Sequence, residues 1–146
     1  ELIIKERPQL EHHVFTLTAS DTLENLTYLV ENLPEVSFHI AAKTNVSDRL
    51  EAFKKYDNVT LYTNVHHDDI IEDLLDQSEI YLDINHWDQV DSIVDRAFEK
   101  GKPVFAFDNV VHRAELGASV FSHQDPEMMV KEIQRQLFGI AVDTVN

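Results

Sequence analysis

The stretch that decides the fold, residues 79–109, reads EIYLDINHWDQVDSIVDRAFEKGKPVFAFDN. It contains two apolar runs of strand length, at residues 80–84 and 104–107. Between them, apolar residues recur at helical spacing over residues 88–100, and a Gly-Lys-Pro turn follows. A buried strand, an amphipathic helix and a second buried strand constitute a βαβ unit, which predicts a parallel sheet.

The rest of the chain repeats this alternation of strand and helix patterns. Further strands are expected at residues 14–17, 36–42, 59–62 and 118–121. Further helices are expected to start at Ser20 or Asp21, at Asn45 or Ser47, at Asp68 and at Asp125–Pro126. The fold class is therefore α/β, with an open parallel Rossmann-like sheet of about six strands and helices on both faces.

Two local features sharpen this pattern. Helical spacing predicts that Ile70, Ile71, Leu74 and Leu75 lie on the inner face of the helix that starts at Asp68. The chain has only three glycines. Most of its turns must therefore be built from Asn, Asp, Ser and Pro.

Composition restricts the possible functions. A chain of 146 residues can form a single domain with a real core. Its net charge of −15 argues against non-specific binding to nucleic acid or to an anionic membrane, since both would be repelled. There is no cysteine and no apolar run of membrane-spanning length, and we expect a cytoplasmic protein.

The candidate site residues follow strands, because parallel α/β sheets bind ligands at the carboxyl ends of their strands. Three loops are expected to converge there. The candidates for binding a donor or nucleotide are Asn85, His86, Trp87, Asp88, Thr63, Asn64, Asp108, Asn109 and Arg113. In addition, a helix starting at Asp88 would offer backbone N–H groups to a phosphate.

Several of these residues have two interpretations. Trp87 could stack on a sugar or base, or it could contact a protein partner. Arg113 could bind a phosphate or pair with Glu115. Asp83, inside the fourth strand, could be an acid or base with a raised pKa or a simple hydrogen-bond acceptor.

Clustered histidines and carboxylates raise the question of a metal. The sequence His66-His67-Asp68-Asp69 resembles a metal cluster, but Asp residues also favour a helix start, and adjacent histidines point to opposite sides. His12-His13 fits a solvated or strand-edge pair. We expect no metal site. The chain also has neither GxGxxG after its first strand nor GxxxxGK[ST], which disfavours ordinary dinucleotide and P-loop domains.

Five segments occur in an order that one enzyme family shares. They are the strand at residues 36–41, NVTLY at 58–62, QSEIYL at 77–82, RAFEKGKPV at 96–104 and DPE at 125–127. This series, over about 100 residues, resembles the C-terminal, donor-binding half of GT-B glycosyltransferases. The resemblance implies that residues 1–146 are a single C-terminal Rossmann-like domain of a longer parent. The N-terminal half would be absent, and this fragment alone should not catalyse.

Within that family, YLDINH at residues 81–86 is similar to the glycosyltransferases of the accessory Sec system, which glycosylate serine-rich adhesins of Gram-positive bacteria. These work as a catalytic subunit with a related co-chaperone subunit that binds the adhesin. The resemblance implies two partners, a related glycosyltransferase subunit and the adhesin as protein acceptor. It also implies a UDP-sugar substrate, UDP-N-acetylglucosamine (UDP-GlcNAc), and no further cofactor.

Two departures from the family pattern bear on activity. Retaining GT-B enzymes carry Glu-x7-Glu in the helix after the fourth strand, whereas the matching residues here are Asp88 and Arg96. An arginine cannot accept a hydrogen bond from a ribose hydroxyl. The basic pair that usually follows the first strand and neutralises the diphosphate is replaced by Thr18-Ala-Ser-Asp21. The donor site is therefore expected to be degenerate, and no catalytic residue can be named.

Two functions remain. The first is a glycosyltransferase domain that takes part in transfer from a UDP-sugar to Ser or Thr of an adhesin. The second is a non-catalytic subunit that holds a catalytic partner and the protein acceptor. A response-regulator-like or sugar-isomerase-like domain is a third class, but the clustered carboxylates and lysine expected of it are missing. The fold alone does not choose among them.

Overall fold

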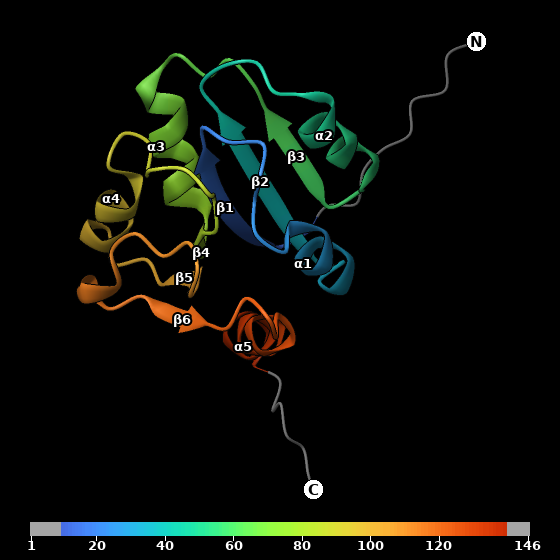
Figure 1. The fold of residues 1–146 in the computed structure, drawn as a ribbon, viewed down its shortest axis with the longest axis vertical. Coiled ribbons are helices and arrows are strands. Elements are labelled where there is room, and N and C mark those ends of the chain that lie inside the picture. The colour runs from blue at the N-terminus through green and yellow to red at the C-terminus, as the bar shows by residue number, and fades with distance from the viewer. Residues whose placement is uncertain (1–9, 140–146) are drawn as a thin grey trace, which may run out of the picture.

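Six parallel strands form one sheet in the computed structural model, which describes residues 10–139. The strands are β1 (His12–Thr18), β2 (Val36–Ala42), β3 (Val59–Tyr62), β4 (Ile80–Asp83), β5 (Val104–Phe107) and β6 (Ser119–Phe121). Their order across the sheet is β3-β2-β1-β4-β5-β6, and every neighbouring pair is parallel. The predicted fold class and strand number are thus confirmed (Figure 1).

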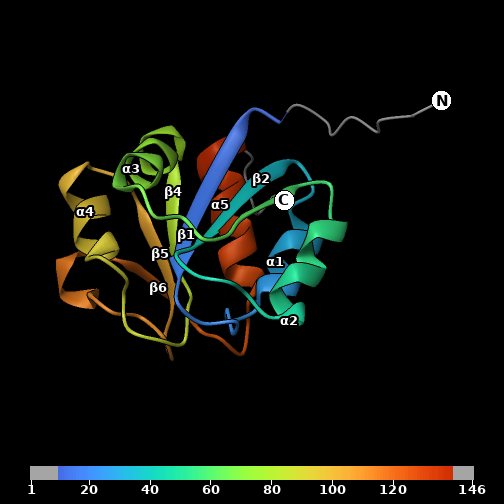
Figure 2. The same cartoon turned by 90° about the horizontal axis from the view of Figure 1, so that it is seen from above.

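Helices cover both faces of the sheet, as Figure 2 shows. One face carries α1 (Leu26–Asn32), α2 (Asp48–Glu51) and α5 (Glu127–Phe138), while the other carries α3 (Asp68–Gln77) and α4 (Ile93–Glu99). Short 3-10 helices follow α2 at Ala52–Lys55 and precede β6 at Ala114–Leu116. Every residue of β4 and β5 is buried, because helices cover both sides of these strands.

The helix predicted at residues 88–100 is shorter than expected, because α4 starts only at Ile93. Asp91 and Ser92 take left-handed backbone conformations, with φ of 54° and 53°, which a helix cannot contain. The side-chain oxygen of Gln89 accepts a hydrogen bond from the backbone N–H of Val94, at 2.9 Å. Asp88 therefore lies in a loop, and the prediction that a helix start there supplies N–H groups for a phosphate is wrong.

The first helix also starts later than predicted. Neither Ser20 nor Asp21 caps it, since α1 begins at Leu26 after Asn25, which has a φ of 57°. Residues 22–24 instead bond the loop after β4, through the Leu23–Asn85 bridge and the backbone groups of Thr22 and Glu24, and are therefore not helical. A contact this distant in sequence leaves no mark in the local pattern.

Two smaller predictions are also corrected. Ile70 is 40% exposed, whereas Ile71, Leu74 and Leu75 are buried as expected. Strand β1, which carries His12 and His13, lies between β2 and β4, so these histidines are not a strand-edge pair.

Asn, Asp and Ser do build several of the turns. Besides the glycines, the residues with positive φ among those described are Asn25, Asn64, Asp91 and Ser92. Asn and Asp tolerate this conformation better than most residues because their short side chains can hydrogen-bond locally. Among residues 10–139, no helix is both long and apolar enough to cross a membrane.

Candidate functional site

The strand order reverses between β1 and β4, and this switch point is where open α/β sheets place their ligands. From β1 the chain proceeds outward to β2 and β3, and it then returns to β4 on the other side of β1. The loops that follow β1 and β4 would therefore be expected to diverge and leave a crevice. The structure closes that crevice with its own backbone.

The loop after β1 pairs with the loop after β4. Leu23 and Asn85 form an antiparallel bridge. The backbone N–H of Glu24 donates to the carbonyl of Ile84 at 2.8 Å, and that of His86 donates to the carbonyl of Thr22 at 3.2 Å. Free peptide N–H groups at such a position can bind phosphate. Here these two N–H groups already have protein partners.

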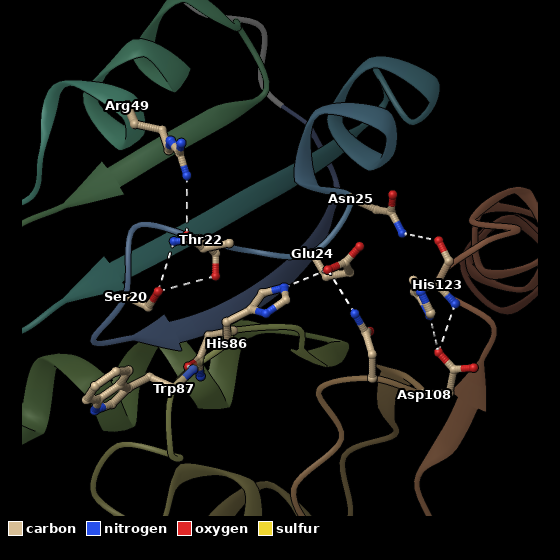
Figure 3. Close-up of polar contacts among 11 residues, drawn as sticks. Ser20, Thr22, Glu24, Asn25, Arg49, His86, Trp87, Asp108 and His123 are labelled. Carbon is tan, nitrogen blue, oxygen red and sulfur yellow. Dashed lines mark hydrogen bonds and ion pairs between the residues drawn. The ribbon is translucent and has the colours of Figure 1, made fainter.

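A carboxylate lies over this closed switch point. Glu24 Oε1 is 2.6 Å from His86 Nε2 and accepts a hydrogen bond from Asn109 Nδ2 at 3.1 Å. Figure 3 shows the imidazole of His86 pointing toward Glu24. The contact joins residues from the loops after β1, β4 and β5. Local sequence gives no sign of the role of Glu24, because it depends on contacts 62 and 85 residues away.

Beside the closed switch point lies a hollow of about 370 Å³. Its lining comes from two loops and consists of Asn85, His86, Trp87, Asp88, Asn109, Val110, Val111 and His112. The structure thus brings five of the nine predicted site residues to one hollow. Its volume lies in the range of roughly 300–1,000 Å³ that is usual for small-molecule sites.

The other predicted residues lie outside this hollow. Thr63 and Asn64 follow β3, which β2 and β1 separate from β4, and Asn64 Nδ2 donates to Asn45 Oδ1 at 2.7 Å. Asp108 binds His123 instead, through the backbone N–H at 3.0 Å and Nδ1 at 2.7 Å. All three loops follow parallel strands and so share one end of the sheet, but only two of them line the hollow.

His112 lines the hollow and is bound to the buried Asp83. Asp83 is 1% exposed and accepts hydrogen bonds from His112, from the backbone N–H at 2.8 Å and from Nδ1 at 2.5 Å. The other ring nitrogen, Nε2, is 2.5 Å from the carbonyl oxygen of Trp87. A carboxylate and a carbonyl only accept, so both nitrogens carry a proton when both bonds form. The Asp83 carboxylate accordingly raises the pKa of His112.

This arrangement agrees with the hydrogen-bond interpretation of Asp83. The carboxylate connects the end of β4 to the loop after β5, and His112 then connects that loop to Trp87. His112 is not among the candidate residues predicted from the sequence, since its partners are 29 and 25 positions away.

Hydrogen bonds fix the backbone of Trp87, while its ring faces solvent. Its N–H donates to Asn85 Oδ1 at 2.7 Å, and its carbonyl faces His112. The side chain of Asn85 can hold this position because the residue is 1% exposed and fixed between β4 and the loop. Trp87 itself is 65% exposed, and its ring points away from the Glu24 contacts in Figure 3.

The arginines near the site are bound to carboxylates. Arg113 Nη1 contacts Asp95 at 2.5 Å and its Nε contacts Glu115 at 2.7 Å, which agrees with the ion-pair interpretation of this residue. Arg96 extends from α4 to Asp68 and Glu72 on α3, at 3.1 and 2.7 Å. It therefore ties two helices together at the position of the family's second glutamate.

Arg49 differs from these arginines. Within residues 10–139 its one hydrogen bond is to Thr22 Oγ1, at 3.4 Å, and it has no ion pair (Figure 3). It lines a second hollow of about 560 Å³ beside α1 and α2, together with Tyr28, Glu31 and Phe53.

His12 and His13 each contact another side chain. Among the described residues, no group of three or more His, Asp or Glu side chains could hold a metal ion. His12 Nδ1 pairs with Glu79 at 3.1 Å. His13 lies 2.9 Å from His39, whose other ring nitrogen lies 2.9 Å from the hydroxyl of Tyr62. Burial and the neighbouring His13 lower the pKa of His39 to about 4.

Solved structures define the class of this domain. It superposes on the glycosyltransferase GlyE of Streptococcus pneumoniae TIGR4 with a TM-score of 0.80 and 33% identity, covering 86% of this chain and 32% of that one. A GtfA/B complex bound to UDP and GlcNAc matches with a TM-score of 0.79 and 35% identity, over 90% of this chain and 30% of the other. The domain thus has the Rossmann-like fold of one half of GT-B glycosyltransferases.

The family to which the chain belongs is narrower than this fold class. Residues 14–140 match the model of the GftB/GlyA-F C-terminal domain, and the chain belongs to this family. A UDP-N-acetylglucosamine–peptide N-acetylglucosaminyltransferase stabilizing protein GtfB of Streptococcus agalactiae is 42% identical over 86% of this chain. The glycosyltransferase GlyB of Streptococcus pneumoniae serotype 4 is 40% identical over 87%. The chain spans only 28% and 31% of these two relatives.

Proposed function

We propose that this chain is the C-terminal domain of the acceptor-binding subunit of a glycosyltransferase pair, and that its own crevice does not hold a nucleotide sugar. The pair would transfer N-acetylglucosamine from UDP-GlcNAc to Ser or Thr of a serine-rich adhesin in the cytoplasm. The catalytic site would belong to a related glycosyltransferase subunit.

The closed switch point is the observation that carries this proposal. A nucleotide diphosphate needs backbone N–H groups or cations, and the N–H groups of Glu24 and His86 are already bonded. Glu24 adds a carboxylate at the same position, and Arg113 is bound to two other carboxylates. With a net charge of −15, the domain has no surplus of positive charge to compensate.

The names of relatives support a partner subunit. One relative is named as a stabilizing protein for a peptide N-acetylglucosaminyltransferase, and one similar structure is a GtfA/B complex. A protein that holds a catalytic subunit and the acceptor does not need a donor site of its own. The loss of phosphate-binding groups is then tolerated.

A second candidate function is an active glycosyltransferase. GlyB, at 40% identity, carries that name, and Asp88 retains a carboxylate at the first position of the family's acidic pair. In this case the hollow beside Trp87 would hold the donor. The two candidates differ in whether this domain binds UDP.

Two measurements test the proposal. Radiolabelled sugar transfer from UDP-GlcNAc to a serine-rich acceptor is measured with the parent protein alone, with a catalytic partner alone and with both. We expect transfer by the pair to exceed that of the partner, and none by the parent alone. Calorimetric titration of the present chain with UDP at low salt should show no saturable micromolar binding. Transfer by the parent alone, or micromolar UDP binding, favours the active-enzyme function.

A further inference from the structure

We propose that the groove between α1 and α2 binds a peptide segment of a protein partner in which a single carboxylate lies beside an apolar side chain. The groove consists of two adjoining hollows of about 560 and 380 Å³, which share the lining residues Thr27, Glu31, Arg49 and Phe53. Its lining has no residue in common with the hollow beside Trp87. The proposal goes beyond the proposed function, because it holds for a binding subunit and for an active enzyme alike.

The groove collects cations that lack a carboxylate partner. Within residues 10–139, the lysines and arginines that contact no carboxylate are Arg49, Lys55 and Lys102. Lys102 Nζ instead donates to the carbonyl oxygen of Asp76 on α3, at 3.0 Å. The other two both line the groove. In a chain with a net charge of −15, this local charge complements a carboxylate from outside the domain.

The guanidinium of Arg49 is available to a ligand, since a 3.4 Å contact is its one hydrogen bond to the described residues (Figure 3). Two carboxylates also line the groove, but each accepts from another donor. Glu31 accepts from the hydroxyl of Tyr56 at 2.5 Å, and Asp21 accepts from the backbone N–H of Ser47 at 3.3 Å. A guanidinium whose N–H groups are free can bind a carboxylate through two parallel hydrogen bonds.

Apolar side chains beside this arginine favour a peptide over a small anion. Leu23, Leu26 and Phe53 line the groove together with Tyr28. A phosphate ion would leave these surfaces in contact with water, whereas an apolar side chain next to the ligand's carboxylate would cover them. Covering them also lowers the local dielectric constant, which strengthens the ion pair with Arg49.

The carboxylates of Asp21 and Glu31 limit the charge of the ligand. Both border the groove, so they would repel a second acidic group on the peptide. A run of acidic residues, or a nucleic acid, would in addition meet the negative charge of the whole domain. The groove therefore suits one carboxylate with an apolar neighbour.

Phage display of random heptapeptides tests the proposal without assuming a partner. Selections are run in parallel on the full chain and on its Arg49→Gln variant. We expect the peptides enriched on wild type to share one Asp or Glu next to Leu, Ile or an aromatic residue. The same peptides should not be enriched on the variant. A labelled synthetic peptide with the enriched sequence is then titrated by fluorescence anisotropy.

Matched variants identify the contact. Arg49→Gln should weaken peptide binding at least tenfold, or about 1.4 kcal/mol, and amidation of the peptide's acidic side chain should do the same. Arg49→Lys should lose less, because it keeps the charge without the two parallel hydrogen bonds. Arg135→Gln is the control, since it removes the same charge from an exposed site on α5 outside the groove, and it should leave the affinity unchanged. Circular dichroism checks that each variant folds.

Several outcomes would overturn the proposal. These are enriched peptides without an acidic residue, equal binding to wild type and Arg49→Gln, and no enrichment on wild type. Saturable binding of inorganic phosphate or UDP that Arg49→Gln removes would make the groove a general anion site. A dimer in analytical ultracentrifugation that Arg49→Gln dissociates would make it a contact between two copies of this chain.

Discussion

Asp83→Asn should destabilise the domain and abolish the unusual titration of His112. The substitution keeps the shape of the side chain and leaves an acceptor for the backbone N–H of His112, but it removes the charge opposite Nδ1. Hydrogen bonds to charged groups contribute roughly 1.5–3 kcal/mol, and this pair is only 17% and 1% exposed, so solvent screens it little. We expect a loss in that range. For a domain of this size it corresponds to about 3–12 °C in melting temperature.

The pH dependence gives the sign of the effect. The folded state raises the pKa of His112 above its ordinary value of 6.5, so the folded protein retains a proton that the unfolded chain releases. The pair therefore contributes fully below pH 6.5, and its contribution falls as the pH rises through the folded-state pKa. The difference in stability between wild type and Asp83→Asn should be largest below pH 6.5 and should shrink toward alkaline pH.

The assay is urea unfolding at several pH values, combined with NMR titration of the His112 ring protons. His112→Asn and the double variant complete a mutant cycle, in which contacting groups show coupling of about 0.5–3 kcal/mol. A stability of Asp83→Asn within about 0.5 kcal/mol of wild type at pH 6 would contradict this role of the pair. A normal titration of His112 in wild type, or a mutant cycle without coupling, would contradict it as well.

Three other predictions concern His39 and two buried core residues, Leu75 and Tyr81. Because the folded state lowers the pKa of His39 to about 4, the free energy of unfolding should fall as the pH drops from 6.5 toward 4. The loss should be at most about 3 kcal/mol, and less where water reaches the ring. His39→Gln should flatten this fall in acid unfolding curves. Leu75→Ala, at a fully buried position, should cost roughly 2–5 kcal/mol in urea unfolding, while Ile70→Ala on the same helix, at 40% exposure, should cost much less. Equal losses of stability for Leu75→Ala and Ile70→Ala would contradict the burial of Leu75 and the exposure of Ile70 on α3. Tyr81→Phe leaves the backbone N–H of Leu17 without its 3.1 Å partner and should cost roughly 1–3 kcal/mol by thermal melting, and an unchanged melting temperature would contradict this.

Local pattern was enough to predict the strands. The bounds of β2, β3 and β5 are those predicted, because short continuous apolar runs are typical of strands that helices cover on both faces. The start of α3 at Asp68 was also predicted correctly, from its acidic first turn and its apolar spacing. The two helices that flank the switch point were predicted less well. Both α1 and α4 begin later than their patterns suggest, because tertiary contacts hold the preceding residues extended or in turns.

The sequence by itself determined the α/β class and the alternation of strands and helices, and it predicted three candidate loops after strands, of which the structure brings two to the hollow. Each of these follows from apolar spacing within a few residues or from the rule that ligand loops follow parallel strands. Only the tertiary structure shows that the loops after β1 and β4 pair and close the switch point. Glu24 meets His86 and Asn109, and Asp83 meets His112, through hydrogen bonds between residues at least 29 positions apart. Such contacts have no periodicity or local propensity, since they arise only when the strand order brings β1, β4 and β5 side by side.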